Sequence, residues 1–201
     1  MTLRKSLAVL LSMFSFFMLS HAQTSAPPVQ KTSGRMMYVF QGTASGIFEP
    51  DAGSATAFAD ESFTLTVTAD AGAIVSSAQR CAVLSGDCKL WLAPVASANI
   101  SVAGMTATIT SPLRIFVNRT FPAVGLQRQT GADLLDLQGQ KAFATYDLSG
   151  DLELPEPFFE KPTNVAQFDC AHACVLTNRG SLTVKSVQNV RFAASQMPSG
   201  Q

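Results

Sequence analysis

Apolar and polar residues alternate with a period of two along much of this chain. In the clearest run, Phe63, Leu65, Val67 and Ala69 are separated by single threonines. Because successive side chains of a strand point to opposite faces, this pattern predicts an antiparallel strand with one buried face and one face rich in hydroxyls. The segment 105–110 repeats the pattern with three further threonines. We therefore expect a fold built from half-buried strands.

Shorter apolar segments, separated by turn residues, predict additional strands. They are Lys89–Leu92, Ile100–Gly104, Leu113–Val117, Phe143–Leu148, Asp151–Leu154, Ser181–Val187 and Val190–Ala194. Two segments favour short helical turns instead, Asp133–Leu137 with its three crowded leucines and Asn164–Ala173. Many short strands with hydroxyl-rich faces predict an all-β fold, a two-sheet antiparallel β-sandwich of the jelly-roll or immunoglobulin-like kind.

The N-terminus has the three parts of a secretory signal peptide. Arg4 and Lys5 precede an apolar run, Leu7–Leu19, and small residues at 20 and 22 favour cleavage after Ala22. As a helix, the apolar run would reach only about 20 Å, which is short of a hydrocarbon core of about 30 Å. We expect a cleaved signal peptide over residues 1–22 and a secreted or periplasmic protein.

The remainder of the chain is predicted to hold one folded domain. Residues 23–34 are rich in proline, serine and threonine and predict a flexible linker, residues 35–195 the β-sandwich domain, and residues 196–201 a disordered tail. No later segment approaches 18 consecutive apolar residues, so we expect no membrane span in the mature chain. Its 12 basic and 14 acidic side chains, counted without Arg4 and Lys5, argue against nucleic acid as a partner.

Four cysteines in an exported chain predict two disulfides. A hairpin turning around Leu84 and Ser85 would place Cys81 directly opposite Cys88. Cys170 and Cys174 are close in sequence, but a bond between them requires a tight turn, because an extended segment would separate their Cα atoms by about 13 Å. We favour these two local pairs, while the other two connectivities stay open.

The segment around His172 also supports an alternative hypothesis, a metal site. Cys170, His172 and Cys174 are three candidate ligands within five residues. On a strand they would be spaced too widely for one zinc ion, and disulfide formation competes for the same sulfurs. Carboxylates form a second kind of candidate, because oxygen ligands suit Ca²⁺. These are Asp147, Asp151 and Glu153 around one turn, and Asp133 and Asp136 near another. Solvated turns are the simpler interpretation, so we expect no metal and no cofactor.

Catalysis by a nucleophile is not expected. His172 is the one histidine outside the predicted signal peptide, and it lies between two cysteines that we expect to be bonded. The chain has no G-x-S-x-G, P-loop or H-E-x-x-H motif, and the glycines of Gly42–Gly46 lie within a strand pattern. We therefore expect a protein that is not an enzyme.

A carbohydrate-binding or carbohydrate-cleaving module is the other alternative. It would use an exposed aromatic ring beside two carboxylates, and the candidates are Trp91, Tyr146, Asp147 and Asp151. The hypothesis requires that Trp91 or Tyr146 lies exposed in a groove. One tryptophan and two tyrosines are few for such a module, which favours a core position for these rings.

The order of several segments resembles a group of exported bacterial β-sandwich proteins of unknown function. Many members of that group carry a C-terminal PEP-CTERM sorting tail, which is absent here, whereas the two cysteine pairs are additional. The resemblance implies a bacterial exported β-sandwich and brings no activity with it. It spans 38–194, and the segments that carry it are Gly42–Gly46, Phe58–Asp70, Ala107–Asn118, Val124–Leu126, Ala132–Leu137, Ala142–Leu148 and Gly180–Ala194.

Together these features predict a non-catalytic structural or binding protein of the cell envelope or extracellular matrix. Its expected partner is a glycan or an envelope protein.

Overall fold

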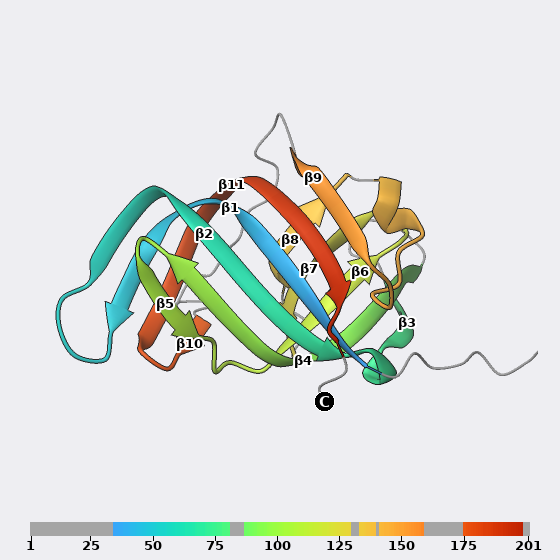
Figure 1. The fold of residues 1–201 in the computed structure, drawn as a ribbon, viewed down its shortest axis with the longest axis horizontal. Helices are drawn as coiled ribbons and strands as arrows, with labels where there is room; N and C mark the ends of the chain where they lie inside the picture. Colours follow the sequence, from blue (N-terminus) through green and yellow to red (C-terminus); the bar gives the residue numbers. More distant parts are fainter. Residues whose placement is uncertain (1–33, 81–86, 130–132, 140, 159–174, 199–201) are drawn as a thin grey trace, which may run out of the picture. The chain divides into compact units, whose positions relative to one another are not determined.

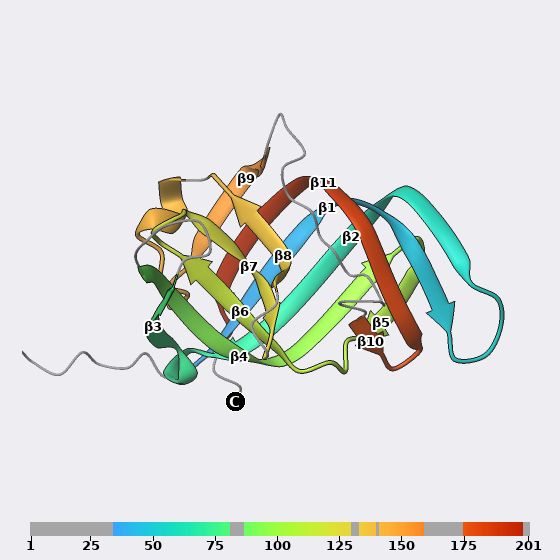
Figure 2. The same cartoon turned by 180° about the vertical axis from the view of Figure 1, so that it is seen from behind.

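A computed structural model describes residues 34–80, 87–129, 133–139, 141–158 and 175–198 (Figures 1 and 2). The chain separates into two units, Met1–Gln30 and Lys31–Gln201, and every element described below belongs to the second. The predicted signal peptide, 1–22, and all of the predicted linker except Gly34 lie outside the described residues, so both stay predictions.

The described elements are strands and two short 3-10 helices. In chain order they are β1 (Arg35–Pro50), β2 (Thr56–Asp70), η1 (Ala71–Ala73), β3 (Val75–Arg80), β4 (Asp87–Val102), β5 (Met105–Thr108), β6 (Leu113–Asn118), β7 (Ala123–Arg128), β8 (Asp133–Gln138), η2 (Lys141–Ala144), β9 (Leu152–Phe158), β10 (Val175–Thr177) and β11 (Gly180–Gln196).

All strand pairs are antiparallel, which confirms the predicted all-β class. The strands follow the order β10-β11-β1-β2-β4-β6-β7-β8, with β3 and β5 paired to β4 and β9 paired to β11. Most neighbours in space are therefore close in sequence, and the last long strand returns to lie beside the first (Figure 1). This meander differs from the Greek-key connections of jelly rolls and immunoglobulin domains.

Strand β4 belongs to both parts of the sheet and joins them. Its first half, to Pro94, pairs with β3 and β6, and its second half, from Val95, pairs with β2 and β5. The sheet thus has two parts that share β4, and β6, β7 and β8 lie behind β1 and β2 in Figure 1. The expectation of two separate sheets is corrected to a single sheet whose two parts contribute to one core.

The core is formed by side chains that point inward from both parts of the sheet. Phe192 of β11 lies near its centre, 5.1 Å from Phe40 of β1 and 5.8 Å from Phe143 of η2, measured between ring centroids. Leu126 of β7 and Leu135 of β8 belong to the same buried cluster. In β2, the apolar residues predicted from the alternation are buried, whereas the threonines between them are half-buried.

Two local predictions are wrong. Residues Phe143–Leu148, predicted as a strand, begin in η2 and continue through a turn in which Leu148 has a φ of 70°. Residues Asp133–Leu137, predicted as a helical turn, lie in β8, where a register shift opposite Leu126 and Gln127 allows the adjacent Leu134 and Leu135 both to be buried. The predicted helical turn Asn164–Ala173 lies outside the described residues.

Candidate functional site

A pocket of about 330 Å³ opens between three hairpins at one end of the sheet. The ends of β1, β4 and β10 lie on the left in Figure 1 and on the right in Figure 2. The β1–β2 hairpin, the β4–β5 turn and the β10–β11 turn all contribute to the lining. The lining residues are Phe48, Pro50, Thr56, Phe58, Val102, Ala103, Gly104, Met105 and Arg179.

The β4–β5 turn is tight because its two central residues adopt the left-handed conformation. Ala103 has a φ of 51° and Gly104 a φ of 74°, and Val102 pairs with Met105 across them. This is the arrangement of a two-residue type I′ hairpin turn, whose twist matches that of the strands. The turn brings Val102 and Met105 together at the pocket, where Val102 is fully buried and Met105 is half-buried.

The β10–β11 turn is held by hydrogen bonds on both sides of Arg179. The Thr177 hydroxyl donates to the Gly180 carbonyl at 2.7 Å and accepts from the Arg179 amide at 3.1 Å. The Asp51 amide donates to the Arg179 carbonyl at 3.3 Å. At Gly180, φ is 130° and a Cβ atom would lie 2.2 Å from the carbonyl oxygen of Glu49, so the position requires glycine. The backbone at Arg179 is thus fixed against the β1–β2 hairpin.

Hydrogen bonds also join β10 and the turn after it to β5 and to the residues that follow β5. The Thr110 amide donates to the Leu176 carbonyl at 2.8 Å, and the Asn178 amide donates to the Thr108 carbonyl at 2.9 Å. The Asn178 side chain accepts from the Thr108 amide at 2.9 Å. These bonds hold the walls of the pocket together, although their residues are about seventy positions apart in the chain.

Arg179 provides the charge in the pocket lining. Its Nη1 donates to the Thr106 carbonyl at 3.2 Å, and the residue is exposed. Among the described residues the structure records one ion pair, between Arg119 and Asp147, and it does not involve Arg179. The nearby Glu49 carboxylate accepts a hydrogen bond of 3.1 Å from the Ser181 hydroxyl. The pocket therefore combines an apolar wall with one guanidinium group.

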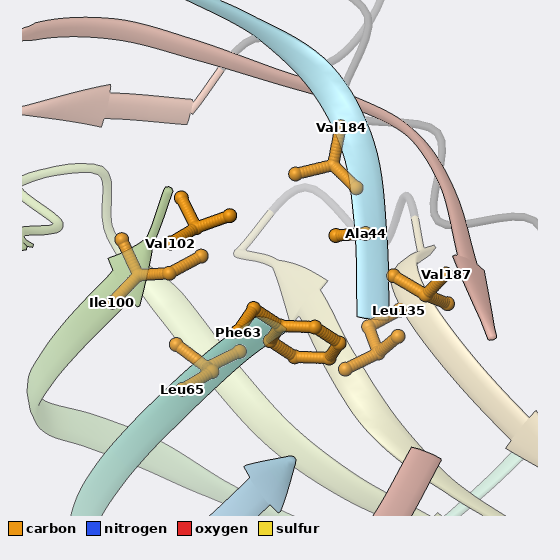
Figure 3. Close-up of a pocket in the computed structure, with 8 residues that line it drawn as sticks. All are labelled: Ala44, Phe63, Leu65, Ile100, Val102, Leu135, Val184 and Val187. Atoms are coloured by element: carbon orange, nitrogen blue, oxygen red, sulfur yellow. The ribbon is translucent and has the colours of Figure 1, made fainter. Parts of the chain in front are cut away.

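The core beneath the pocket is closely packed. Val102 lines both the pocket and an interior gap of about 10 Å³ (Figure 3). That gap is near the smallest volume that holds a water molecule, and all of its lining side chains are apolar. Its lining residues are Ala44, Phe63, Leu65, Ile100, Val102, Leu135, Val184 and Val187. Of these two spaces, the outer pocket is the one large enough for a small ligand.

The two aromatic rings that the carbohydrate alternative would use are not exposed platforms. Tyr146 is buried, with 8% of its surface exposed, and its hydroxyl donates to the Gly150 carbonyl at 2.9 Å. Trp91 is half-buried against the core, and the Arg119 guanidinium carbon lies 3.7 Å from the centroid of its ring. Tyr146 fails the requirement of the carbohydrate hypothesis, and the guanidinium covers one face of the Trp91 ring.

The two carboxylates of the carbohydrate alternative, Asp147 and Asp151, interact with other groups of the protein. Asp147 accepts from the Ser149 amide and hydroxyl and lies 3.9 Å from Arg119 Nη2, whereas Asp151 accepts from the Gln196 amide at 2.7 Å. Arg119 therefore contacts both Trp91 and Asp147. Nothing in the sequence indicated this role, because an arginine at the end of a strand is common. Asp151 is bonded to the end of β11 instead.

No group of three or more histidines, cysteines and acidic residues within the described part of the chain could hold a metal ion. Asp136 is largely buried, which raises its pKa, while a hydrogen bond from Gln138 opposes the rise. Glu153 lines a separate pocket of about 140 Å³ beside Arg191. The alternative metal ligands Cys170, His172 and Cys174 lie outside the described residues, so that hypothesis stays a prediction.

Cys88 is the one cysteine that the structure describes. It is buried and is not a free thiol. In the β3–β4 ladder, Cys88 pairs with Gln79. Cys81, Cys170 and Cys174 lie outside the described residues, and the pairing of the four cysteines stays a prediction.

No protein-family model, curated protein or solved structure matches this chain. The resemblance to exported bacterial β-sandwich proteins therefore stays an expectation. Among the described residues, none forms a helix that is long and apolar enough to cross a membrane.

Proposed function

We propose that this chain is an exported, non-catalytic binding protein of the cell envelope or extracellular matrix, and that it holds an apolar ligand between its three hairpins. The observation that carries the proposal is the concave pocket of about 330 Å³ with phenylalanine, valine and methionine in its wall. Small-molecule sites are typically concave and mostly apolar, with a few polar groups that orient the ligand, and their volumes begin near 300 Å³.

The chemistry of the lining supports binding rather than catalysis. None of the nine lining residues carries a carboxylate, an imidazole or a thiol. General acid–base catalysis and covalent catalysis usually depend on such groups. The Thr56 hydroxyl and the Arg179 guanidinium are the polar side chains of the lining, and neither is a base at neutral pH.

The apolar lining favours an apolar ligand over a glycan. Glycan sites present an exposed aromatic ring together with hydrogen-bonding groups. Here Tyr146 is buried and one face of Trp91 is covered by Arg119. Support for export comes from the N-terminal sequence, with Arg4 and Lys5 before the apolar run Leu7–Leu19.

The binding site is tested by calorimetric titration of the mature protein with 1-decanol, an uncharged apolar probe. The variant Met105→Trp fills the pocket, because Met105 lies half-buried in its wall. Val75→Trp is the matched control, because Val75 is 54% exposed and lies on β3, outside the pocket lining. We expect saturable binding to the wild type and to the control, and binding at least about tenfold weaker in Met105→Trp, a difference of about 1.4 kcal/mol. Absence of saturable binding to the wild type, or equal binding by Met105→Trp, contradicts the proposal.

Export is tested separately by expressing the full chain in a Gram-negative bacterium and measuring the intact mass of the protein in each cell fraction. We expect a periplasmic or secreted form that begins at Gln23. A full-length protein confined to the cytoplasm would contradict the proposed location without affecting the binding result.

A further inference from the structure

We infer that the ligand of this pocket has a negatively charged group attached to its apolar chain, and that Arg179 binds that group. The inference rests on the proposed function, because it names the ligand class for the same pocket. The shared chemistry is an anionic oxygen group, either the carboxylate of a free acyl chain or the phosphate of a lipid headgroup.

The first support is the charge of the lining. Arg179 is the one charged residue among the nine that line the pocket. Within the described part of the chain, its one side-chain hydrogen bond runs from Nη1 to the Thr106 carbonyl. A guanidinium has five N–H donors in a planar fork, so donors remain for a ligand, and the geometry of the fork suits a carboxylate or a phosphate. A hydrogen bond between two charged groups is also stronger than one between neutral groups.

The second support is the fixed position of the Arg179 backbone. Thr177 and Asp51 hold it by two hydrogen bonds, and Gly180 fits closely against β1. The bond to Thr106 further directs the side chain across the β4–β5 turn. A group that is already positioned before binding loses less conformational entropy when the ligand arrives. The guanidinium is therefore placed to orient one end of a ligand whose apolar part contacts Phe48 and Met105.

Acidic residues near the pocket do not provide an equivalent site for a cation. Glu49 follows Phe48 in β1, but its carboxylate accepts a hydrogen bond from Ser181 and is not part of the lining. Asp51 is exposed in the β1–β2 turn and is likewise outside the lining. Both carboxylates reduce the positive potential around Arg179, yet the charge that faces the pocket is positive. The geometry thus favours an anionic ligand over a cationic one.

The test compares four probes with the same ten-carbon chain and different head groups, namely decanoate, decyl phosphate, 1-decanol and decyltrimethylammonium. Dissociation constants are measured by calorimetry below the critical micelle concentration of each probe. Three proteins are used: the wild type, Arg179→Gln, and the control Lys185→Gln, which removes an exposed cation of β11 outside the pocket lining. Circular dichroism of each protein reports whether the variant is folded.

We expect decanoate and decyl phosphate to bind the wild type and Lys185→Gln at least about tenfold more tightly than 1-decanol. Decyltrimethylammonium should bind least tightly. In Arg179→Gln the preference for the anionic probes should disappear, while binding of 1-decanol should stay within about twofold of the wild type. If Arg179→Gln does not fold, the wild type still provides a test, since raising the salt concentration should weaken decanoate binding and leave 1-decanol binding unchanged.

The outcomes separate this inference from the proposed function. Equal affinities of decanoate and 1-decanol in the wild type overturn the inference and leave the apolar site intact, as does a preference for anions that persists in Arg179→Gln. Absence of binding by all four probes overturns the proposed function as well. A further measurement identifies the source of the anion. Sedimentation with phosphatidylglycerol vesicles, but not with phosphatidylcholine vesicles, assigns a lipid headgroup, whereas binding of decanoate without sedimentation assigns a free acyl chain.

Discussion

The guanidinium of Arg119 lies over the ring of Trp91, with 3.7 Å between its central carbon and the ring centroid. The same side chain donates a hydrogen bond of 2.7 Å from Nε to the Tyr146 carbonyl. Arg119 thus connects β4 to the segment that follows η2. Three of the residues that the sequence suggested as a glycan site are close together because this arginine joins them within the fold.

We predict that Arg119→Met lowers the free energy of unfolding by about 2 to 4 kcal/mol. A cation–π contact contributes about 0.5 to 1 kcal/mol at such sites, and a hydrogen bond from a charged donor about 1.5 to 3 kcal/mol. Asp147→Asn should change stability by less than about 0.5 kcal/mol, because its 3.9 Å ion pair is partly exposed to solvent. Urea denaturation of both variants checks this. Equal effects of the two substitutions would show that the ion pair, and not the ring contact, stabilises the segment.

Tyr38→Phe is predicted to lower the free energy of unfolding more than Tyr146→Phe. The Tyr38 hydroxyl donates to the Leu148 carbonyl at 2.8 Å in a buried environment, where the carbonyl would be left without this donor. Such a loss costs about 1 to 3 kcal/mol. The partner of Tyr146 is the carbonyl of the exposed Gly150, which water can reach. Urea midpoints at neutral pH give the comparison, and the reverse order of stabilities would refute the explanation.

The stability of the protein should fall as the pH rises above about 10. Burial raises the pKa of both Tyr38 and Tyr146 above the ordinary value of 10.0, and nearby groups, including the Asp147 carboxylate, add to the rise. In this range the folded state keeps both protons while the unfolded state loses them, so the unfolded state is favoured as the pH increases. The stabilising effect is complete below pH 10 and is lost above it.

The double variant Tyr38→Phe/Tyr146→Phe checks this pH dependence. We expect its free energy of unfolding to fall less steeply than that of the wild type between about pH 10 and 11.5. The variant lacks the two tyrosine hydroxyls that keep their protons in the folded state and lose them in the unfolded state. Lysines titrate in the same range in both proteins, so the difference in slope is the relevant quantity. Parallel slopes would mean that the tyrosines ionise equally in the two states.

Gly180→Ala should destabilise the protein and also weaken binding of an anionic probe. A Cβ atom there would lie 2.2 Å from the Glu49 carbonyl oxygen, and φ is 130°. We expect a loss of more than about 2 kcal/mol, because both steric overlap and backbone strain are introduced. Gly150→Ala is the matched control, since a Cβ at Gly150 has no atom within 4 Å. Thermal and urea unfolding measure the first effect, and decanoate titration of the folded fraction measures the second. An unchanged affinity would mean that the turn does not position Arg179.

The class of the fold could be predicted from the sequence because local alternation carries it. The alternation correctly predicts which residues of β2 between Phe63 and Ala69 point into the core, since each threonine between them marks the outer face. Errors arose where tertiary structure overrides the local pattern. Phe143 and Leu148 both reach the core from a 3-10 helix and a turn, and Leu134 with Leu135 do so through a register shift. Neither geometry follows a period of two.

The sequence gives little indication that β4 pairs in both parts of the sheet. Proline lacks the amide hydrogen that a sheet ladder needs. Strand β4 continues through Pro94, which lies where its pairing changes from β6 to β2. A sequence shows the proline but not which partners the strand has on either side of it.

The pocket could not be predicted, because its wall is assembled from hairpins that are distant in sequence. Phe48, Val102 and Arg179 share no local sequence pattern that would place them in one site. The contacts of Trp91 and Tyr146 could not be predicted for a related reason. The composition revealed that Trp91 and Tyr146 exist, but their burial depends on Arg119 and on the position of η2.

The most direct test of the account uses the methyl resonances of methionine during a titration with 1-decanol. The protein is labelled with ¹³C at the methionine methyl groups, and Met105 is assigned from the spectrum of Met105→Leu. Met105 lines the pocket, whereas Met36 is fully buried in the core and lies outside the pocket lining. We expect a saturable shift of the Met105 resonance, with the Met36 resonance unchanged. An unchanged Met105 resonance, or a shift of Met36 instead, would contradict the existence of a binding site between the three hairpins.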